Sequence, residues 1–319
     1  MYIIKQIPED FIVKEIPDYR LDEKGEYLYF LLKKKNYTTI DAVLKIAQRL
    51  RIPLKYIGFA GNKDKTAVTQ QVISIKSIKL TDTGRLNLKD IRMEFIGKGS
   101  KPISLGDLKG NQFKITVRNL LTRRTIAKSM EKIPNLFGPQ RFSKNNAEIG
   151  RYLVKKNFKK AIDLMEYKAA DEFLENNPGN FIGAIRTLPL KTRKIYIHAY
   201  QSHLWNRTVK EYLKKTSHYK NELIPIIGFG TEIKNDKIKE ITIEMLHEED
   251  ITQRDFIMPQ MPELSEEGSE RYLFIKPENL VINTEEDELN ENKFKAIVSF
   301  KLPKGSYATI VIDFLFQGL

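Results

Sequence analysis

The segment with the clearest chemical potential is a short polar loop that contains Asp64. Residues 58–70 read Gly-Phe-Ala-Gly-Asn-Lys-Asp-Lys-Thr-Ala-Val-Thr-Gln, which places Asp64 between Lys63 and Lys65. Neighbouring ammonium groups favour the ionised form of a carboxylate, and an ionised aspartate can act as a nucleophile. Gly, Asn and Asp are also common in surface turns. Taken alone, the segment fits both a reactive carboxylate and a solvent-exposed turn.

Two nucleotide-binding interpretations of this loop fail on spacing. A phosphate-binding loop needs Gly, four residues and then Gly-Lys-Ser/Thr, whereas Lys63 is preceded by Asn62 and followed by Asp64. A guanine-reading Asn-Lys-x-Asp element needs a residue between Lys and Asp, which is missing here. The sequence therefore disfavours a nucleotide hydrolase.

The predicted elements around the loop are strands, which can hold a reactive group rigidly. Strands are expected at Tyr56–Phe59 and Gln71–Lys76 on either side of it, and at Gly25–Lys34. A helix is expected from about Ile40 to Arg51, capped near Thr39. This mixed order predicts an α+β fold without the regular alternation of a doubly wound sheet.

The middle of the chain has a different, more helical pattern. Expected elements are helices at Leu121–Ile133, Asn146–Lys156, Phe158–Glu175 and His198–Lys215, and strands at Leu223–Ile227 and Ile241–Met245. Strand-like alternation returns at Lys293–Phe300, followed by a helix from Ser306 towards Phe316. We therefore predict one domain from residues 1–150 and 271–319, with a second domain, residues 151–270, inserted into it.

Composition excludes several kinds of site. The 319 residues contain no Cys, so a disulfide framework, a thiolate zinc site and a cysteine nucleophile are excluded. Among the four histidines, His198 and His203 are five residues apart, which is not the metal-binding spacing on a helix. We expect no metal. The beginning of the chain does not resemble a secretory signal and no apolar run reaches membrane-spanning length, so we expect a cytoplasmic protein without membrane contact.

The net charge of +13 is unevenly distributed. Residues 51–200 carry 30 Lys or Arg against 12 Asp or Glu, whereas residues 201–319 carry 15 against 21. Such asymmetry is typical of a surface that meets a polyanionic backbone. A lysine-rich solvated surface gives the same numbers, so charge alone leaves both possibilities open.

Four separated segments together resemble the TruD family of pseudouridine synthases, in the family's order. They are Lys5 with residues 8–15 (Pro-Glu-Asp-Phe-Ile-Val-Lys-Glu), the Asp64 loop, residues 134–142 (Pro-Asn-Leu-Phe-Gly-Pro-Gln-Arg-Phe) and residues 302–309 (Leu-Pro-Lys-Gly-Ser-Tyr-Ala-Thr). Residues 105–113 and 198–206 add weaker matches. The resemblance spans nearly the whole chain.

The resemblance implies a fold and an activity. The fold would be a pseudouridine synthase catalytic domain with a mixed or antiparallel sheet, interrupted by an inserted α/β domain, the TRUD domain. The activity would be cofactor-free isomerisation of uridine in tRNA, at uridine 13, with Asp64 as nucleophile. No obligate protein partner is implied. A non-catalytic RNA-binding protein on the same scaffold is the alternative, but binding alone has no need of a carboxylate near phosphates.

The resemblance also implies substrate-binding residues. Phe11 and Tyr307 would stack on an extruded uracil, and the amide of Asn135 would match its polar edge. The other expected substrate-binding residues are Lys5, Lys63, Phe137 and Arg141. Taken singly, Phe11 could equally be a core aromatic, Asn135 a turn residue and Tyr307 part of a first helical turn.

Overall fold

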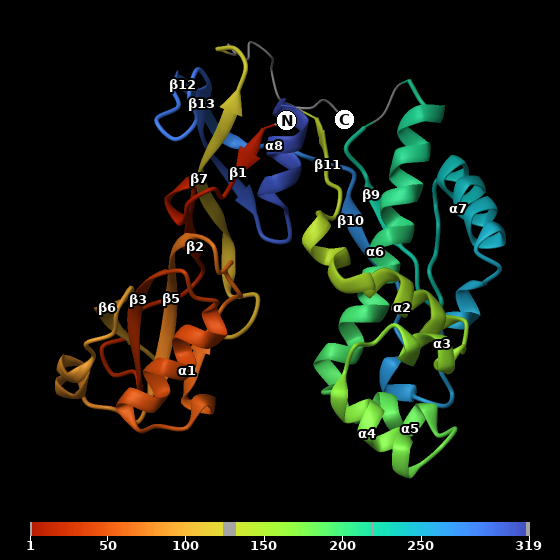
Figure 1. Ribbon diagram of the computed structural model, residues 1–319, viewed down its shortest axis with the longest axis horizontal. Helices are drawn as coiled ribbons and strands as arrows, with labels where there is room; N and C mark the ends of the chain where they lie inside the picture. Colours follow the sequence, from red (N-terminus) through yellow and green to blue (C-terminus); the bar gives the residue numbers. More distant parts are fainter. Residues whose placement is uncertain (1, 124–131, 218–219, 317–319) are drawn as a thin grey trace. The chain divides into compact units, whose positions relative to one another are not determined.

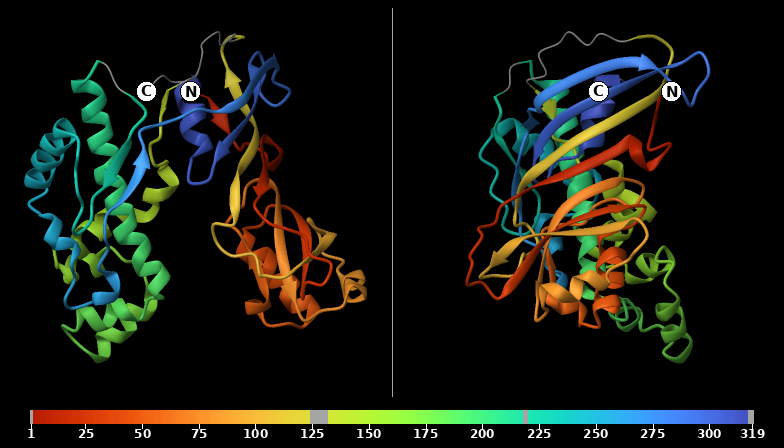
Figure 2. Two further views of the ribbon diagram at one scale, coloured as in Figure 1. Left: turned by 180° about the vertical axis from the view of Figure 1, so that it is seen from behind. Right: turned by 90° about the vertical axis from the view of Figure 1, so that its left-hand side faces the viewer.

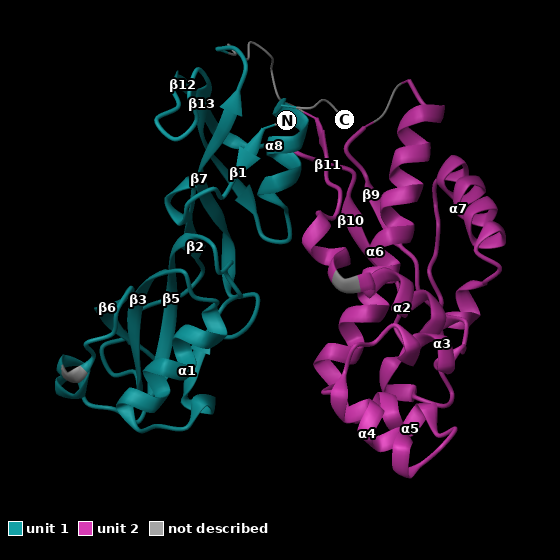
Figure 3. Ribbon diagram, viewed as in Figure 1, with its two compact units in different colours: residues 1–131, 276–319 teal, residues 132–275 magenta. Residues whose placement is uncertain are grey.

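A computed structural model describes residues 2–123, 132–217 and 220–316. The chain forms two compact units, residues 1–131 with 276–319 (unit 1) and residues 132–275 (unit 2), shown in Figure 3. Unit 2 is therefore inserted in the sequence of unit 1. The division differs from the expected boundaries after residues 150 and 270. Gly150 lies within helix α2 (Asn146–Val154), and a Cβ atom there would lie only 2.0 Å from the Tyr196 carbonyl oxygen of helix α6 (Leu190–Lys215), so α2 packs inside unit 2.

Unit 1 is built on a mixed sheet. Its main strand order is β12-β13-β7-β2-β5-β3-β6, with β1 paired to β7 and β4 paired to β5. Strands β2 and β5 are parallel, and the other described pairs are antiparallel. The strands are β1 (Ile3–Ile4), β2 (Phe11–Pro17), β3 (Tyr27–Lys35), β4 (Ile57–Phe59), β5 (Val68–Lys76), β6 (Ile91–Gly99), β7 (Leu108–Leu120), β12 (Glu278–Glu286) and β13 (Phe294–Pro303), as Figure 1 shows. The predicted α+β class with a mixed sheet is confirmed.

Two helices pack on this unit. Helix α1 (Thr39–Leu50) begins after Thr38, whose hydroxyl accepts the Asp41 amide, and buries Val43 and Ile46 against alternate residues of β3 such as Phe30. This helix and β3 confirm two of the predicted elements. Helix α8 (Ala308–Phe316) lies beside the N-terminal strand, where the Tyr2 hydroxyl donates to Asp313 (Figure 2). The N- and C-terminal segments thus pack together within unit 1.

Unit 2 is mainly helical. Its helices are α2, α3 (Phe158–Asp163), α4 (Lys168–Asn176), α5 (Phe181–Arg186), α6 (Leu190–Lys215) and α7 (Asp236–Glu248). Two short antiparallel pairs complete it, β9 (Leu223–Ile226) with β10 (Ser269–Tyr272) and β8 (Ile133–Pro134) with β11 (Phe274–Ile275). The long helix α6 contributes Ile197, Tyr200 and Leu204 to the buried core.

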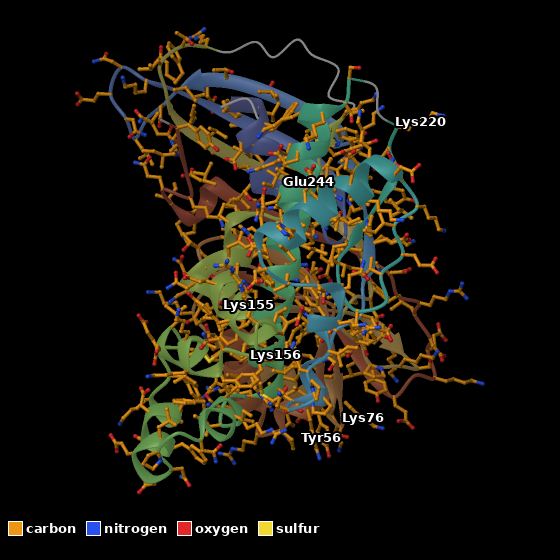
Figure 4. All side chains as sticks on the ribbon, turned by 90° about the vertical axis from the view of Figure 1, so that its right-hand side faces the viewer. Tyr56, Lys76, Lys155, Lys156, Lys220 and Glu244 are labelled. Atoms are coloured by element: carbon orange, nitrogen blue, oxygen red, sulfur yellow. The ribbon has the colours of Figure 1, made fainter. Side chains whose placement is uncertain are left out.

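Lysine side chains also tie the elements of unit 2 together. Lys155 and Lys156 follow α2 and are labelled in Figure 4. The Lys155 ammonium donates to the Glu249 carbonyl oxygen at 2.9 Å, and that of Lys156 donates to the Asp255 carbonyl oxygen. Glu249 directly follows α7, and Asp255 lies in the short 3-10 helix Gln253–Phe256, so these contacts join the end of α2 to the segment after α7.

Three predicted elements of the middle region differ from the structure. Residues Ile241–Met245, expected as a strand, lie in α7, because Ile238, Ile241 and Met245 form one buried helical face. The expected helix Phe158–Glu175 is divided into α3 and α4. The expected helix Leu121–Ile133 falls largely on residues 124–131, outside the described residues, and its last residue belongs to β8.

Candidate active site

The Asp64 loop connects β4 to β5 and is held by buried polar groups. The Thr39 hydroxyl accepts the Lys63 backbone amide at 2.9 Å and donates to the Gln71 side-chain oxygen at 2.8 Å. The Gln71 amide in turn donates to the Gly61 carbonyl oxygen at 3.0 Å. Thr39 and Gln71 are fully buried. A hydrogen-bonded network of this kind fixes the main chain of the loop against β5 and the start of α1.

The carboxylate of Asp64 is contacted by a lysine from the N-terminal segment. The Lys5 ammonium lies 2.6 Å from an Asp64 carboxylate oxygen, and the two side chains are 26% and 25% exposed. The same ammonium lies 4.2 Å from the centre of the Phe11 ring. The structure thus brings together Asp64, Lys5 and Phe11. Phe11 itself is 4% exposed and packs edge-on against Phe113, so the Lys5 ammonium covers part of a largely buried ring.

The side chain of the neighbouring Lys63 points into the sheet. Its ammonium lies 2.7 Å from the Glu15 carboxylate on β2 and 2.8 Å from the Asn111 side-chain oxygen on β7. The Lys63 and Glu15 side chains are only 6% and 1% exposed. A buried carboxylate is costly unless a cation pairs with it, and the Lys63 ammonium pairs with Glu15 inside the sheet. The substrate-binding role of Lys63 stays a prediction.

Tyr307 follows a turn that lies at the same end of the sheet as the Asp64 loop. Gly106, with a φ of +96° that favours glycine, donates its amide to the Ala60 carbonyl oxygen at 2.8 Å. The Lys304 ammonium donates to the Gly106 carbonyl oxygen at 3.1 Å. These contacts connect the loop after β4, the turn at Gly106 and the turn before α8. Tyr307 is half-buried and directly precedes α8, and its stacking role stays a prediction.

The remaining predicted residues form a separate cluster in unit 2. The Arg271 guanidinium donates to both the backbone and side-chain oxygens of Asn135, at 2.7 and 2.6 Å, and lies 4.3 Å from the Phe137 ring centre. The Asn206 side chain pairs with both backbone groups of Phe137, each at 2.9 Å. Arg141 donates to the Ser202 hydroxyl at 3.0 Å. Asn135 and Phe137 are both buried.

Arg271 and Asn206, which partner this cluster, were not among the predicted site residues. Asn206 lies within residues 198–206, a segment already matched to the family, so the signal for it was present. Arg271 is 136 residues from Asn135 and falls in an acidic stretch without a motif. Only the fold brings it to the Asn135 segment.

The chemistry available in unit 1 is that of a carboxylate held on a rigid loop with cationic neighbours. Such a group can act as a nucleophile or stabilise a developing positive charge. Within residues 2–123, 132–217 and 220–316, no cluster of three or more His, Asp or Glu side chains is placed to hold a metal ion. None of the helices in those ranges is long and apolar enough to cross a membrane. The fold and the loop together form a mixed-sheet domain that presents an aspartate able to do such chemistry.

Comparisons with known proteins identify the family. The family model described as tRNA pseudouridine synthase D (TruD) matches residues 2–174, 166–223 and 219–313. The tRNA pseudouridine synthase D of Aquifex aeolicus is 34% identical, over 98% of this chain and 97% of its own length. A crystal structure of tRNA pseudouridine synthase D from Methanosarcina mazei has a TM-score of 0.76 and 26% identity, over 98% of this chain and 93% of that one. The chain belongs to the TruD family of tRNA pseudouridine synthases, which are isomerases, and the predicted family is confirmed.

Proposed function

We propose that this enzyme converts uridine to pseudouridine in tRNA, at uridine 13, without a cofactor and with Asp64 as the nucleophile. The observation that carries the proposal is the Asp64 carboxylate, held on an anchored loop with the Lys5 ammonium 2.6 Å away. Unit 1 is the catalytic domain. Unit 2 is the inserted TRUD domain and contributes RNA contacts.

The reaction needs little beyond such a centre. The bond from ribose C1′ to uracil N1 breaks, the base rotates, and a bond from C1′ to C5 forms. The C5 proton leaves and N1 gains a proton, so no redox step or group transfer requires a cofactor. A covalent intermediate on Asp64 divides this change into two steps, through attack on either the sugar or the uracil ring.

The target uridine must leave its stack to reach Asp64. Tyr307 offers a half-buried ring on which the uracil stacks, and Lys5 and Phe11 line the carboxylate side of the site. Asn135, Phe137 and Arg141 are the tRNA-contacting residues that we propose for unit 2. Because the Asn135 side-chain oxygen accepts from Arg271 and its amide donates to the Tyr272 carbonyl oxygen at 3.1 Å, RNA can use only its remaining donor and acceptor capacity.

The test uses purified wild-type protein and the variant Asp64→Asn with unmodified tRNA and no added cofactor. Mapping pseudouridine in the tRNA should give one modified position for the wild type and none for the variant. RNA affinity of the variant should stay within a few-fold, because removing an anion near phosphates does not weaken binding. Asp18→Asn is the matched control, since Asp18 is a 63% exposed carboxylate of the same unit, and it should remain fully active.

Two results would contradict the proposal. Substantial turnover by Asp64→Asn would remove Asp64 from the mechanism. Binding of tRNA by the wild type without any pseudouridine formation would favour the non-catalytic RNA-binding alternative.

A further inference from the structure

A buried ammonium group lies at the base of the Asp64 loop and is not used by the chemistry above. Lys34 on β3 is 2% exposed. Its ammonium donates to the Asp64 backbone carbonyl oxygen at 3.0 Å and to the Tyr37 carbonyl oxygen. Within the described residues, no carboxylate forms an ion pair with it. Burying a charge is costly unless it is paired, so this contact requires an explanation.

The charges around Lys34 connect it to the reactive group. Burial lowers the pKa of Lys34 to about 8, against an opposing attraction from Asp64. The other charged groups that act on it are Lys63 of the loop, which repels it, and Asp41 of α1, which attracts it. With this pKa the ammonium is still protonated at neutral pH. Strand β3 therefore presents a positive charge to the loop that carries Asp64.

Neutral donors could satisfy two carbonyl groups without the cost of burying a charge. The two bonds of Lys34 join the Asp64 main chain to the segment just before α1 and are additional to the network of Thr39 and Gln71. A positive charge on Lys34, in contrast to a neutral donor, can also act on the Asp64 carboxylate.

We propose that Lys34 is a positioning residue that fixes the Asp64 main chain and stabilises the ionised Asp64 carboxylate. The inference rests on the proposed function of Asp64. It assigns Lys34 no contact with substrate. Its predicted signature is a loss of reaction rate without a loss of tRNA binding, together with a changed pH dependence.

The experiment compares Lys34→Met and Lys34→Gln with the matched control Lys33→Met. Lys33 is the adjacent residue on β3 but is 42% exposed and pairs with Glu94 at the surface. Single-turnover pseudouridine formation, tRNA affinity and melting temperature are measured for each protein across the acidic and neutral pH range. Both Lys34 variants should react at least about tenfold more slowly, with tRNA affinity within about threefold of the wild type.

The pH dependence separates positioning from simple structural support. Without the Lys34 cation, ionised Asp64 loses an attractive partner, and the acidic limb of the rate profile should move to higher pH. Lys5 and Lys63 remain in all variants, so the change reports Lys34 alone. Lys33→Met should keep the wild-type rate and profile.

The outcomes decide the inference. Full rates with an unmoved acidic limb would overturn it. A loss of rate in proportion to the loss of folded protein, with the acidic limb of the rate profile unmoved, would also overturn it. If Lys34→Met does not fold, Lys34→Gln, which keeps a polar donor, decides the question. Wild-type protein that forms no pseudouridine would instead overturn the proposed function itself.

Discussion

Arg118 and Lys34 are both buried cations of unit 1, with very different surroundings. The Arg118 guanidinium on β7 is bound by Asp10 at 2.9 Å, Asp287 at 2.6 Å and Glu288 at 3.0 Å. Lys34 on β3 is bound by two backbone carbonyl oxygens. The first cation joins η1 (Pro8–Asp10) to the turn between β12 and β13, and the second lies under the Asp64 loop.

The pKa values follow from these surroundings. For Arg118, burial would lower the pKa, but hydrogen bonds to Glu288, Asp287 and Asp10 raise it above its usual value. For Lys34, burial dominates and lowers the pKa to about 8. A fully paired charge is what a structural role demands. An incompletely compensated charge beside a reactive loop is typical of a functional site, where stability is given up for a favourable arrangement of groups.

The largest expected effect comes from removing the paired cation. Arg118→Leu leaves Asp10 and Asp287 buried without their partner, so the free energy of unfolding should fall by about 3–5 kcal/mol. Urea-dependent hydrogen exchange of β7 and β13 measures the stability of unit 1 directly. The surface control Lys33→Met should change it by less than about 1 kcal/mol. If Arg118→Leu lowers the free energy of unfolding as little as Lys33→Met does, Arg118 does not stabilise the buried carboxylates.

The Arg118 cluster also shows what the sequence could not predict. Asp287 is 169 residues from Arg118, and charged residues so far apart carry no local pattern that pairs them. The inward orientation of Lys63 was unpredictable for the same reason, because its partners Glu15 and Asn111 come from other strands.

Local features were predictable where residue type and spacing determine structure within a few residues. The strands on either side of the Asp64 loop and the helix that begins near Thr39 follow from alternation and capping, and the structure has both. The strand expected at Ile241–Met245 was wrong because a short apolar run fits either period, and packing in unit 2 selects the helix. The roles of Asp64, Tyr307 and Asn135 rest on motifs, and they stay predictions.

An intermediate effect is expected from Lys34 at alkaline pH. Its pKa in the folded protein is about 8, against an ordinary 10.5, so the folded state binds fewer protons between these values. Wild-type stability should therefore rise with pH across this interval, by up to about 3 kcal/mol, and Lys34→Met lacks this contribution. Urea unfolding of both proteins at pH 7.5 and 10.5 gives the difference. If the free energies of unfolding of the two proteins change with pH in parallel, the pKa of Lys34 is not lowered, and its buried ammonium is stabilised by more than its two carbonyl contacts.

The smallest effect is expected at the exposed edge of the Arg118 cluster. Hydrogen bonds from Arg118 and then Lys295 lower the pKa of Glu288 from 4.5 to about 2. A carboxyl group with a lowered folded-state pKa adds stability above its unfolded value, and this is lost as the pH falls from about 4.5 towards 2. The Glu288 side chain is 54% exposed, so solvent screening keeps the contribution well below that of Arg118.

Glu288→Gln should accordingly be slightly less stable than the wild type at pH 6, and the two proteins should converge as the pH approaches 2. Urea unfolding across this range measures the difference, and added salt should reduce it at pH 6 because the pair is near the surface. Glu94→Gln is the matched control, since Glu94 is 63% exposed and pairs with Lys33 alone among the described salt bridges. If Glu288→Gln destabilises unit 1 as much as Arg118→Leu does, the exposed Glu288 carboxylate holds the guanidinium, and the buried Asp10 and Asp287 do not. The buried ion pairs of Arg118 would then not explain its structural role. The contrast with Lys34, whose charge is incompletely compensated, would lose its basis.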